Sequence, residues 1–223
     1  MFKINMSNTI QLKIENKIAF ITLNRPEVFN SFNREMALAL QDSFDACEAN
    51  DAVRAIVLSG KGKAFCAGQD LKEVTTPEIN PGFKKILEEH YNPLITRIRE
   101  IKKPVIAAVN GVAAGAGANI ALACDIVIAD ERASFIQAFS LIGLVPDSAG
   151  TYFLPRLIGF QKALALAMLG DKIGAKEAEK LGMIYRYVSS EEFEETVNKL
   201  ADKLANMPTN ALGMIKELFN KSM

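Results

Sequence analysis

Three short segments contain residues whose types and spacing could support proton-transfer chemistry. Asp147 follows Pro146 within Gly143–Gly150 and stands at the head of an apolar stretch, so it is a candidate acid or base. The segments Phe65–Asp70 and Gly115–Asn119 are rich in small residues and could offer backbone N–H groups to an oxyanion. Together these segments are typical of an active site in which one residue removes a proton to form an enolate and then returns it. A single base favours isomerisation over the addition of water.

The neighbours of Asp147 bear on its pKa. Burial among Phe139, Leu144, Val145 and Phe153 would disfavour the carboxylate and raise the pKa of Asp147. A raised pKa suits a group that must both accept and return a proton. An aspartate after a proline is also common in turns and at helix N-caps, and this capping role is compatible with the catalytic one.

The composition argues against several other kinds of chemistry. His90 is the only histidine among 223 residues, so Ser-His-Asp and Cys-His machinery is disfavoured, and no Cys/His/carboxylate cluster has metal-ligand spacing. Lysine plus arginine and aspartate plus glutamate number 26 each, which leaves no basic surface for nucleic acid. No apolar run reaches the ~18–20 residues of a membrane span, and Met1–Thr9 lacks a signal-peptide core. The three scattered cysteines indicate reduced thiols, so we expect a soluble, cytoplasmic protein with no metal.

Several individual residues have a structural interpretation. Gly115–Gly117 lacks the third glycine and the acidic residue of a dinucleotide-binding fingerprint, which disfavours NAD. We expect Cys66 to be a small buried filler, Asp70 to cap the helix that follows it, and Asp125 to end a strand. His90 stands beside two glutamates, which predicts a solvated helix face.

Hydrophobic periodicity predicts the elements that must position these segments. Strands are expected at Ile10–Ile14, Ile18–Leu23, Ala55–Gly60, Pro104–Asn110, Asp125–Ala129 and Met183–Val188. Helices are expected at Asn33–Glu48, Phe83–Ile101, Gly115–Cys124, Tyr152–Ile158, Gln161–Leu169, Ala175–Leu181, Glu191–Asn206 and Thr209–Lys221. The alternation of strands and helices predicts βαβ units, a mostly parallel sheet and an α/β fold. We divide the chain into a catalytic domain, residues 1–190, and a helical C-terminal region, residues 191–223.

Three sequence markers follow one another in order along the chain: Ala64–Leu71, Lys103–Gly111 and Cys124–Ile126. They resemble the crotonase (enoyl-CoA hydratase/isomerase) superfamily, and the resemblance covers essentially the whole chain. It implies a spiral of ββα turns, a bound acyl-CoA thioester, no cofactor besides that coenzyme A carrier, and homotrimers or dimers of trimers. Family members usually continue with further helices, so residues 191–223 are expected to be the start of an oligomerisation region.

The resemblance also implies roles for individual residues. The N–H groups of Gln69 and Ala116 would hold the thioester oxygen, and Asp147 would move the proton. The start of a helix at Ala116 agrees with this, since N–H groups there are unpaired. Around the coenzyme A moiety the family implies Val28, Ala67, Gln69, Asp70 and Leu71. The substrate pocket would include Gly115, Asn119 and Phe139.

Two positions depart from the hydratase pattern of the superfamily. Hydratases place two glutamates around the bound water, and those positions are Asn119 and Phe139 here, neither of which can accept a proton. The segment Phe139–Asp147 instead resembles the branch that isomerises ring epoxides of aromatic acyl-CoA esters in phenylacetate catabolism. The expected activity is therefore isomerisation of such an epoxide, or a shift of a 3-enoyl-CoA double bond to the 2-enoyl position.

Other functions stay open at this point. A 2-enoyl-CoA hydratase with a changed site is the main alternative, and a non-catalytic acyl-CoA-binding homologue is another. A third branch, the dehalogenases, uses an aspartate at this place as a nucleophile, but Phe139-Ser140 is not the aromatic–histidine combination typical of that branch. Asn119 could orient the substrate or satisfy buried backbone, and the sequence leaves both roles open.

Overall fold

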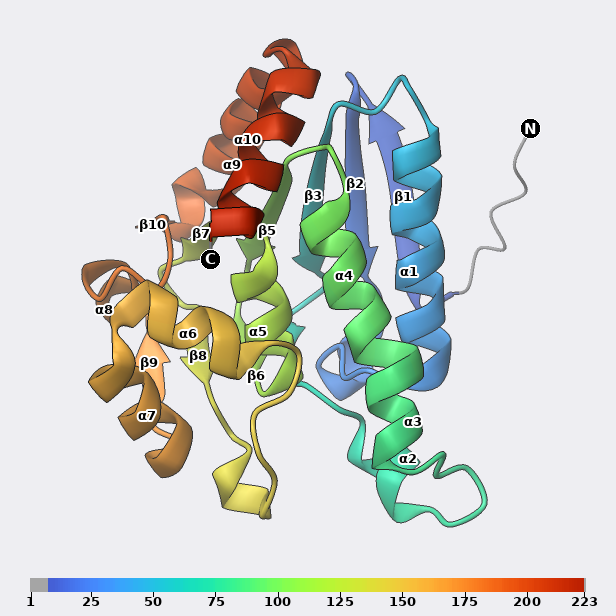
Figure 1. Ribbon diagram of the computed structural model, residues 1–223, viewed down its shortest axis with the longest axis vertical. Coiled ribbons are helices and arrows are strands. Elements are labelled where there is room, and N and C mark those ends of the chain that lie inside the picture. Colours follow the sequence, from blue (N-terminus) through green and yellow to red (C-terminus); the bar gives the residue numbers. More distant parts are fainter. Residues whose placement is uncertain (1–7, 223) are drawn as a thin grey trace.

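The computed structural model describes residues 8–222, and most of Met1–Thr9 therefore lies outside the described residues. It contains a six-stranded and a four-stranded sheet covered by helices (Figure 1). Strands of the larger sheet run in the order β1 (Ile10–Glu15), β2 (Ile18–Leu23), β3 (Ala55–Gly60), β5 (Val105–Val109), β7 (Ile126–Asp130) and β10 (Arg186–Val188). Only the β1–β2 hairpin is antiparallel among these pairs. The predicted hairpin and parallel sheet are confirmed.

The central strands of the larger sheet are buried on both faces. Alternate residues of β3 point to opposite sides, so Ile56 and Leu58 join the main core while Ala55 and Val57 join a second core. Helices α1 (Arg34–Ala49) and α4 (Asn92–Glu100) lie side by side across the first face (Figure 1). Helix α9 (Ser190–Asn206) covers the second face. This explains why the central strands are continuous apolar runs rather than alternating ones.

A four-stranded sheet accompanies the larger one, and the sequence patterns did not reveal it. Its strands are β4 (Ala64–Cys66), β6 (Val112–Ala114), β8 (Ser134–Ile136) and β9 (Lys172–Gly174). Three of them directly follow β3, β5 and β7, so each of these three strands is followed by a short strand and then by helical residues. The observed architecture is the expected spiral of ββα units.

The remaining helices are α2 (Leu71–Thr75), α3 (Phe83–Lys85), α5 (Ala116–Ala123), α6 (Gly150–Ile158), α7 (Phe160–Leu169), α8 (Ala175–Lys180) and α10 (Thr209–Ser222). Helix α2 is the one expected to follow Asp70, for which no bounds were predicted. The others agree with the predicted helices to within one or two residues at each end, except in the segment Phe83–Ile101. Short 3₁₀ turns occupy Pro26–Val28 and Ser140–Ile142. In the described part of the chain, no helix combines the length and apolar character needed to cross a membrane.

The predicted helix Phe83–Ile101 has a π-helical middle, Ile86–Tyr91, between α3 and α4. The i→i+5 bonds of this segment widen the turn and shift its residues from ordinary helical positions. His90 is consequently 1% exposed, and its Nε2 lies 3.3 Å from the guanidinium Nη1 of Arg34. The prediction of a solvated face for His90 is wrong, and burial lowers the pKa of the imidazole.

Asp125 precedes β7 and connects three elements. Its Oδ2 accepts hydrogen bonds from the backbone N–H of Val105 (2.8 Å) and from the buried Lys216 of α10 (2.8 Å). Arg99 of α4 approaches the other carboxylate oxygen at 3.4 Å. The expected structural role of Asp125 at the end of a strand is confirmed.

Candidate functional site

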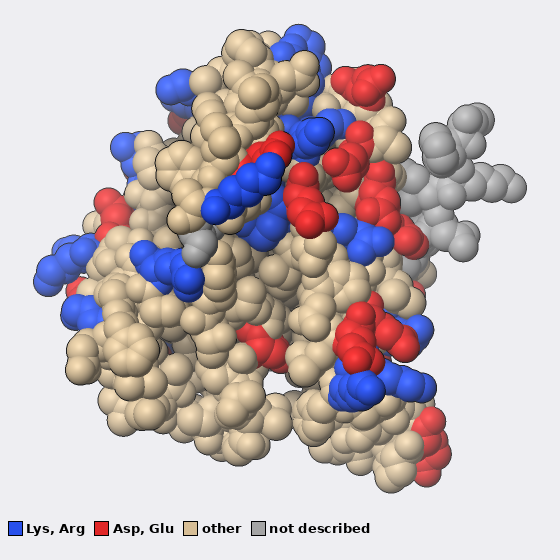
Figure 2. All heavy atoms as spheres, in the orientation of Figure 1, with Lys and Arg blue, Asp and Glu red and all other residues tan. Residues whose placement is uncertain are grey.

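A cavity of about 470 Å³ lies between the α3–π-helical segment and the loop that precedes α6. Figure 2 shows this face of the molecule hollowed between that loop and the α2–α3 region. The lining side chains are mostly apolar and come from Ala67–Gln69, Leu71, Phe83, Ile86, Leu87, Tyr91, Asn92, Gly115, Ala116, Ala138, Phe139, Ile142 and Leu144–Ala149. The cavity therefore brings together all three segments that the sequence marked as capable of chemistry.

The two predicted oxyanion donors adjoin each other on the cavity wall. A Cβ atom added to Gly117 would lie 2.3 Å from the carbonyl oxygen of Cys66, so α5 packs directly on the strand end. A Cβ added to Gly68 would lie 3.6 Å from the nitrogen of Ala116. Within residues 8–222, the N–H groups of Gln69 and Ala116 make no hydrogen bond to a backbone carbonyl. Two adjacent unpaired donors can stabilise a negatively charged oxygen.

Helix α5 begins at the cavity because of the backbone at Gly115. This residue has φ 53° and ψ −126°, a conformation open essentially only to glycine. Its N–H group donates to the carbonyl of Ile136 (2.9 Å), which ties the start of the helix to β8. The positive end of the helix dipole at Ala116 then faces the cavity.

Asp147 is the carboxylate of this cavity. Burial raises its pKa from the model-compound value of 3.8 to about 6, and the hydrogen bond from the Ser148 hydroxyl (2.9 Å) opposes this only in part. The predicted rise in the pKa is confirmed. A group with a pKa near 6 can both accept and return a proton close to neutral pH.

The predicted capping role of Asp147 is wrong. Helix α6 begins at Gly150, its N-cap is Ala149, and no side chain caps it. Ser148 and Ala149 both adopt left-handed backbone conformations, with φ of 49° and 58°. This tight turn takes up the positions where a cap would form, and it leaves the Asp147 carboxyl on the cavity wall. Left-handed residues other than glycine cost ~1–3 kcal/mol each and cluster at functional sites.

Asn119 was expected to line the substrate pocket, but it lies behind the loop that carries Asp147. Its Nδ2 donates to the backbone carbonyl of Asp147 (2.9 Å), and its Oδ1 accepts from Nε2 of Gln137 (2.8 Å). A Cβ added to Gly150 would lie 2.2 Å from that Nδ2 atom, so α6 packs directly on the amide. Of the two roles that the sequence left open, the structure shows the satisfaction of buried backbone.

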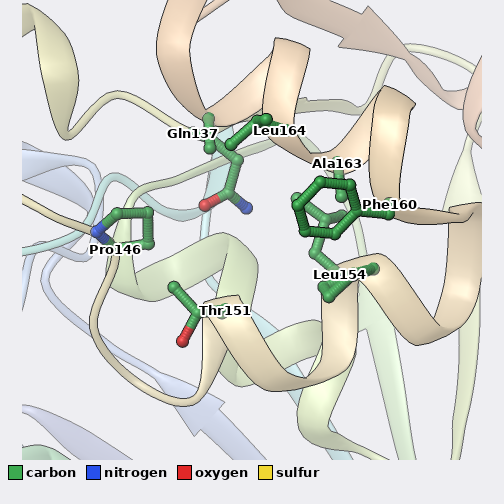
Figure 3. A pocket seen from close by; sticks show the side chains of 10 residues that line it. Gln137, Pro146, Thr151, Leu154, Phe160, Ala163 and Leu164 are labelled. Carbon is green, nitrogen blue, oxygen red and sulfur yellow. The ribbon is translucent and has the colours of Figure 1, made fainter.

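A second cavity of about 130 Å³ lies between α6 and α7 (Figure 3). Figure 3 shows Gln137 and Pro146 on one side of it and Phe160 on the other. Pro146 lines both cavities, so the loop that carries Asp147 separates them. The hydrogen bond from Asn119 to the backbone carbonyl of Asp147 anchors this loop.

The residues expected around coenzyme A divide into two groups. Ala67, Gln69 and Leu71 line the large cavity, and Leu71 is 58% exposed. Val28 and Asp70 do not line it: Val28 ends a 3₁₀ turn, and the Asp70 carboxylate is used within the protein. It accepts from the N–H of Lys72 (3.0 Å) and from the Arg25 guanidinium (2.9 Å). The capping role predicted for Asp70 is confirmed, and the coenzyme A contacts stay predictions.

Two further observations concern the surroundings of the site. Cys66 is buried, and burial raises the pKa of its thiol to about 12, as expected of a filler rather than a nucleophile. Tyr91 lines the cavity and is fully buried, but helical periodicity gave no sign of this because the residue ends the π-helical segment. Among residues 8–222, no group of three or more His, Cys, Asp or Glu side chains could hold a metal ion.

A family model and two similar proteins place the chain among the same group of enzymes. A family model described as enoyl-CoA hydratase/isomerase matches residues 13–223. The chain is 44% identical to 1,2-epoxyphenylacetyl-CoA isomerase of Escherichia coli over 97% of its length and 84% of that protein. It is also 44% identical to a probable enoyl-CoA hydratase of Rhodobacter capsulatus, over 97% of its length and 82% of that protein.

A solved structure agrees with these matches. The crystal structure of a protein from Mycobacterium abscessus that is assigned as an enoyl-CoA hydratase/isomerase superposes with a TM-score of 0.89 at 39% identity, covering 96% of this chain and 83% of that one. The match to the family model spans both sheets and all of the cavity residues described above. The chain therefore belongs to the enoyl-CoA hydratase/isomerase family, with the crotonase fold.

Proposed function

We propose that this protein is an acyl-CoA isomerase that uses Asp147 as its single proton shuttle. The observation that carries the proposal is the placement of one half-buried carboxyl group, with a pKa of about 6, in the same cavity as the free N–H groups of Gln69 and Ala116. Among the described residues that line the cavity, Asp147 is the only carboxylate. Hydration usually requires a second group to hold and deprotonate water.

The proposed reaction begins with the thioester oxygen accepting hydrogen bonds from Gln69 and Ala116. The carboxylate of Asp147 removes a proton from the carbon next to the thioester carbonyl, and the electrons of that C–H bond form the enolate. Each oxyanion donor typically contributes ~2.7–4 kcal/mol at this stage. The now neutral carboxyl group of Asp147 holds the proton until the electrons have moved through the substrate.

The preferred substrate is a ring epoxide such as 1,2-epoxyphenylacetyl-CoA. The enolate electrons open the strained epoxide and expand the ring to an oxepin, after which Asp147 returns the proton to a ring carbon. Atoms and charge balance, because the product is an isomer of the substrate. The name of the Escherichia coli relative and the apolar cavity wall support this choice.

Two other reactions have support of their own. A 3-enoyl to 2-enoyl double-bond shift would use the same two donors and the same single base. Hydration of a 2-enoyl-CoA is supported by the name of the Rhodobacter capsulatus relative, which is equally similar. Asn119 and Phe139 disfavour hydration, because they occupy the positions of the two hydratase glutamates and neither side chain can accept a proton.

The test compares purified wild-type protein with Asp147→Asn on 1,2-epoxyphenylacetyl-CoA, a 3-enoyl-CoA and crotonyl-CoA. We expect the wild-type protein to turn over the epoxide, the 3-enoyl ester or both, and to leave crotonyl-CoA unconverted. In Asp147→Asn this turnover should fall by about 10³-fold or more, as for the removal of an essential acid–base residue. Asp171→Asn, at an exposed aspartate outside the described cavity, is the matched control.

Three other outcomes would replace the proposal. Fast hydration of crotonyl-CoA that survives Asp147→Asn would identify a hydratase. Tight binding of all three esters without turnover would identify a non-catalytic acyl-CoA-binding protein. A covalent adduct on Asp147, detected by mass spectrometry, would identify the carboxylate as a nucleophile.

A further inference from the structure

Tyr91 has a place in the cavity that the proposed reaction does not use. It ends the π-helical segment Ile86–Tyr91, its side chain is fully buried, and it lines the cavity together with Asp147 and Gln69. Its hydroxyl donates a hydrogen bond to the Oε1 atom of Gln69 (2.7 Å). The contact therefore links the cavity wall to the residue whose backbone N–H is the first oxyanion donor.

The side-chain amide of Gln69 is held at both of its ends. While Oε1 accepts from Tyr91, Nε2 donates to Oε2 of Glu73 (2.7 Å). Glu73 is itself buried, and its Oε1 accepts from the backbone N–H of Arg34 at the start of α1 (2.8 Å). A continuous set of hydrogen bonds thus runs from the start of α1 through Glu73 and Gln69 to Tyr91 in the cavity.

The main chain on either side of Gln69 is fixed as well. The N–H of Phe32 donates to the carbonyl of Gly68 (2.7 Å), and the N–H of Asp70 donates to the carbonyl of Phe32 (2.8 Å). Phe32 also packs edge-on against the Tyr91 ring, with the ring centroids 6.0 Å apart. The N–H of Gly68 donates to Sγ of Cys66 (3.3 Å), so within Gly68–Asp70 the Gln69 N–H group is the donor for which the described chain provides no acceptor.

We propose that Tyr91 is a positioning residue, which holds the Gln69 side chain and thereby fixes the direction of the oxyanion-donating N–H group of Gln69. This inference rests on the proposed use of that N–H group as an oxyanion donor. An N–H group must lie close to 3 Å from the developing oxyanion, so a small rotation of the Gln69 peptide weakens the bond. The role requires a hydroxyl group at position 91, and an aromatic ring alone cannot fill it.

The Tyr91 hydroxyl keeps its proton under working conditions. Burial, followed by the negative charge of Asp147, raises the pKa of the phenol well above its usual value. A phenol has a single proton, and here that proton is directed to Gln69. Tyr91 therefore acts as a fixed donor to the amide, and Asp147 is left as the group that exchanges protons.

The most direct test measures the bound thioester carbonyl and does not depend on turnover. Phenylacetyl-CoA labelled with ¹³C at the thioester carbonyl is bound to wild-type protein, Tyr91→Phe and a control, and the C=O stretching frequency is recorded by infrared difference spectroscopy. We expect the wild type to shift this band to lower frequency and Tyr91→Phe to reverse a substantial part of the shift. Tyr187→Phe, on strand β10 and outside the cavity lining, should match the wild type.

Kinetics with a double mutant determine whether Tyr91 acts through Gln69. Loss of one hydrogen bond should lower kcat in Tyr91→Phe by about tenfold while KM changes less than about twofold. Gln69→Met keeps the backbone N–H but removes both side-chain bonds, so Tyr91→Phe should add less than about twofold on that background. The same tenfold loss in both backgrounds would overturn the proposal, because Tyr91 would then act on the substrate itself.

The remaining outcomes are also decisive. A wild-type carbonyl frequency in Tyr91→Phe would refute the positioning role, even if the protein were a hydratase rather than an isomerase. If Tyr91→Phe does not fold, Glu73→Gln is used instead, because it weakens the hydrogen bond at the Nε2 end of the Gln69 amide. A carbonyl shift in the same direction then supports the proposal, and an unchanged frequency refutes it.

Discussion

Asp147 gives the protein a pH dependence that its other carboxylates do not predict. Because its pKa is about 6, the carboxylate form that must accept the first proton is depleted below that pH. We expect kcat/KM for the preferred thioester to rise with pH, to reach half of its plateau near pH 6 and to level off above about pH 7. A pH–rate profile between pH 4.5 and 8.5 measures this, and a midpoint near pH 4 would contradict the buried position of the group.

The same shift has a consequence for stability. The pKa of Asp147 is about 6 in the folded protein against a model-compound value of 3.8, so the folded state binds the proton more tightly. The resulting stabilisation is fully present below about pH 4 and is lost as the pH rises through about 6. At pH 8 the ionised Asp147 therefore makes folding less favourable by roughly 2–3 kcal/mol, at about 1.4 kcal/mol per pKa unit.

Asp147→Asn should therefore remove activity and stabilise the fold at the same time. We expect the free energy of unfolding to rise by roughly 2–3 kcal/mol at pH 8 and to change little at pH 4, as measured by urea denaturation at both values. Asp171→Asn, at an exposed position, should change neither value by more than about 0.5 kcal/mol. A loss of stability at pH 8 in Asp147→Asn would show that the carboxylate makes favourable contacts beyond Ser148.

At the scale of the elements, the sequence predicted the parts of the fold with a long periodic signal. The strands of the larger sheet are apolar runs of five or six residues in most cases, and their pattern is unambiguous. The strands of the four-stranded sheet have three residues each, which is too short for any alternation to be visible. Only the pairing of β4, β6 and β8 in space identifies them.

The candidate site was predictable to a similar degree. Glycine-rich segments and a carboxylate in an apolar sequence are local signals, so the segments around Gln69, Ala116 and Asp147 could be identified. The position of Asn119 could not, because its partners are the carbonyl of Asp147 and the side chain of Gln137, 28 and 18 residues away. Tyr91 was not predicted to line the cavity, because the π-helical turn places it where an α-helical count does not.

Helix α5 and strand β4 must approach closely for the two oxyanion donors to adjoin. Gly117→Ala would set a methyl group 2.3 Å from the Cys66 carbonyl oxygen, where backbone has to move. We expect the free energy of unfolding to fall by ~1–3 kcal/mol, as for other overpacked sites, and turnover to fall with it because the donors separate. Denaturant titration and steady-state kinetics measure the two effects.

Gly174 offers a matched control for that substitution. It has an ordinary φ of −75° and no atom within 4 Å of an added Cβ. Gly174→Ala should leave turnover unchanged and stabilise the fold slightly, by up to ~1 kcal/mol, because alanine restricts the unfolded chain. Equal losses in the two variants would show that the α5–β4 contact has no special importance.

At the scale of the whole molecule, helices α7 and α10 expose large apolar side chains. They are Phe160, Leu164, Met168 and Leu169 on α7, and Met214, Ile215, Leu218 and Phe219 on α10. Exposed apolar groups in such numbers are typical of protein–protein contact surfaces. We propose that copies of the chain associate through these faces, as homotrimers or dimers of trimers.

Light scattering coupled to gel filtration tests this association. The expected mass is three or six times that of one chain, and Phe160→Glu, at a side chain that is 70% exposed, should shift it towards the monomer by placing a charge in the interface. Lys162→Glu, a charge change near the start of the same helix, serves as the comparison. A monomeric wild-type protein at micromolar concentration would refute the proposal.

The burial of the thiols has a consequence for the lifetime of the catalyst. Cys47, Cys66 and Cys124 are all buried, and burial raises their thiol pKa values to about 11, 12 and 12. An epoxide is an alkylating agent, and its usual target in proteins is the thiolate form of cysteine. Cys66 directly precedes the cavity-lining Ala67, yet it stays protonated and covered. Under the proposed function, we therefore expect the three thiols to escape alkylation by the epoxide substrate.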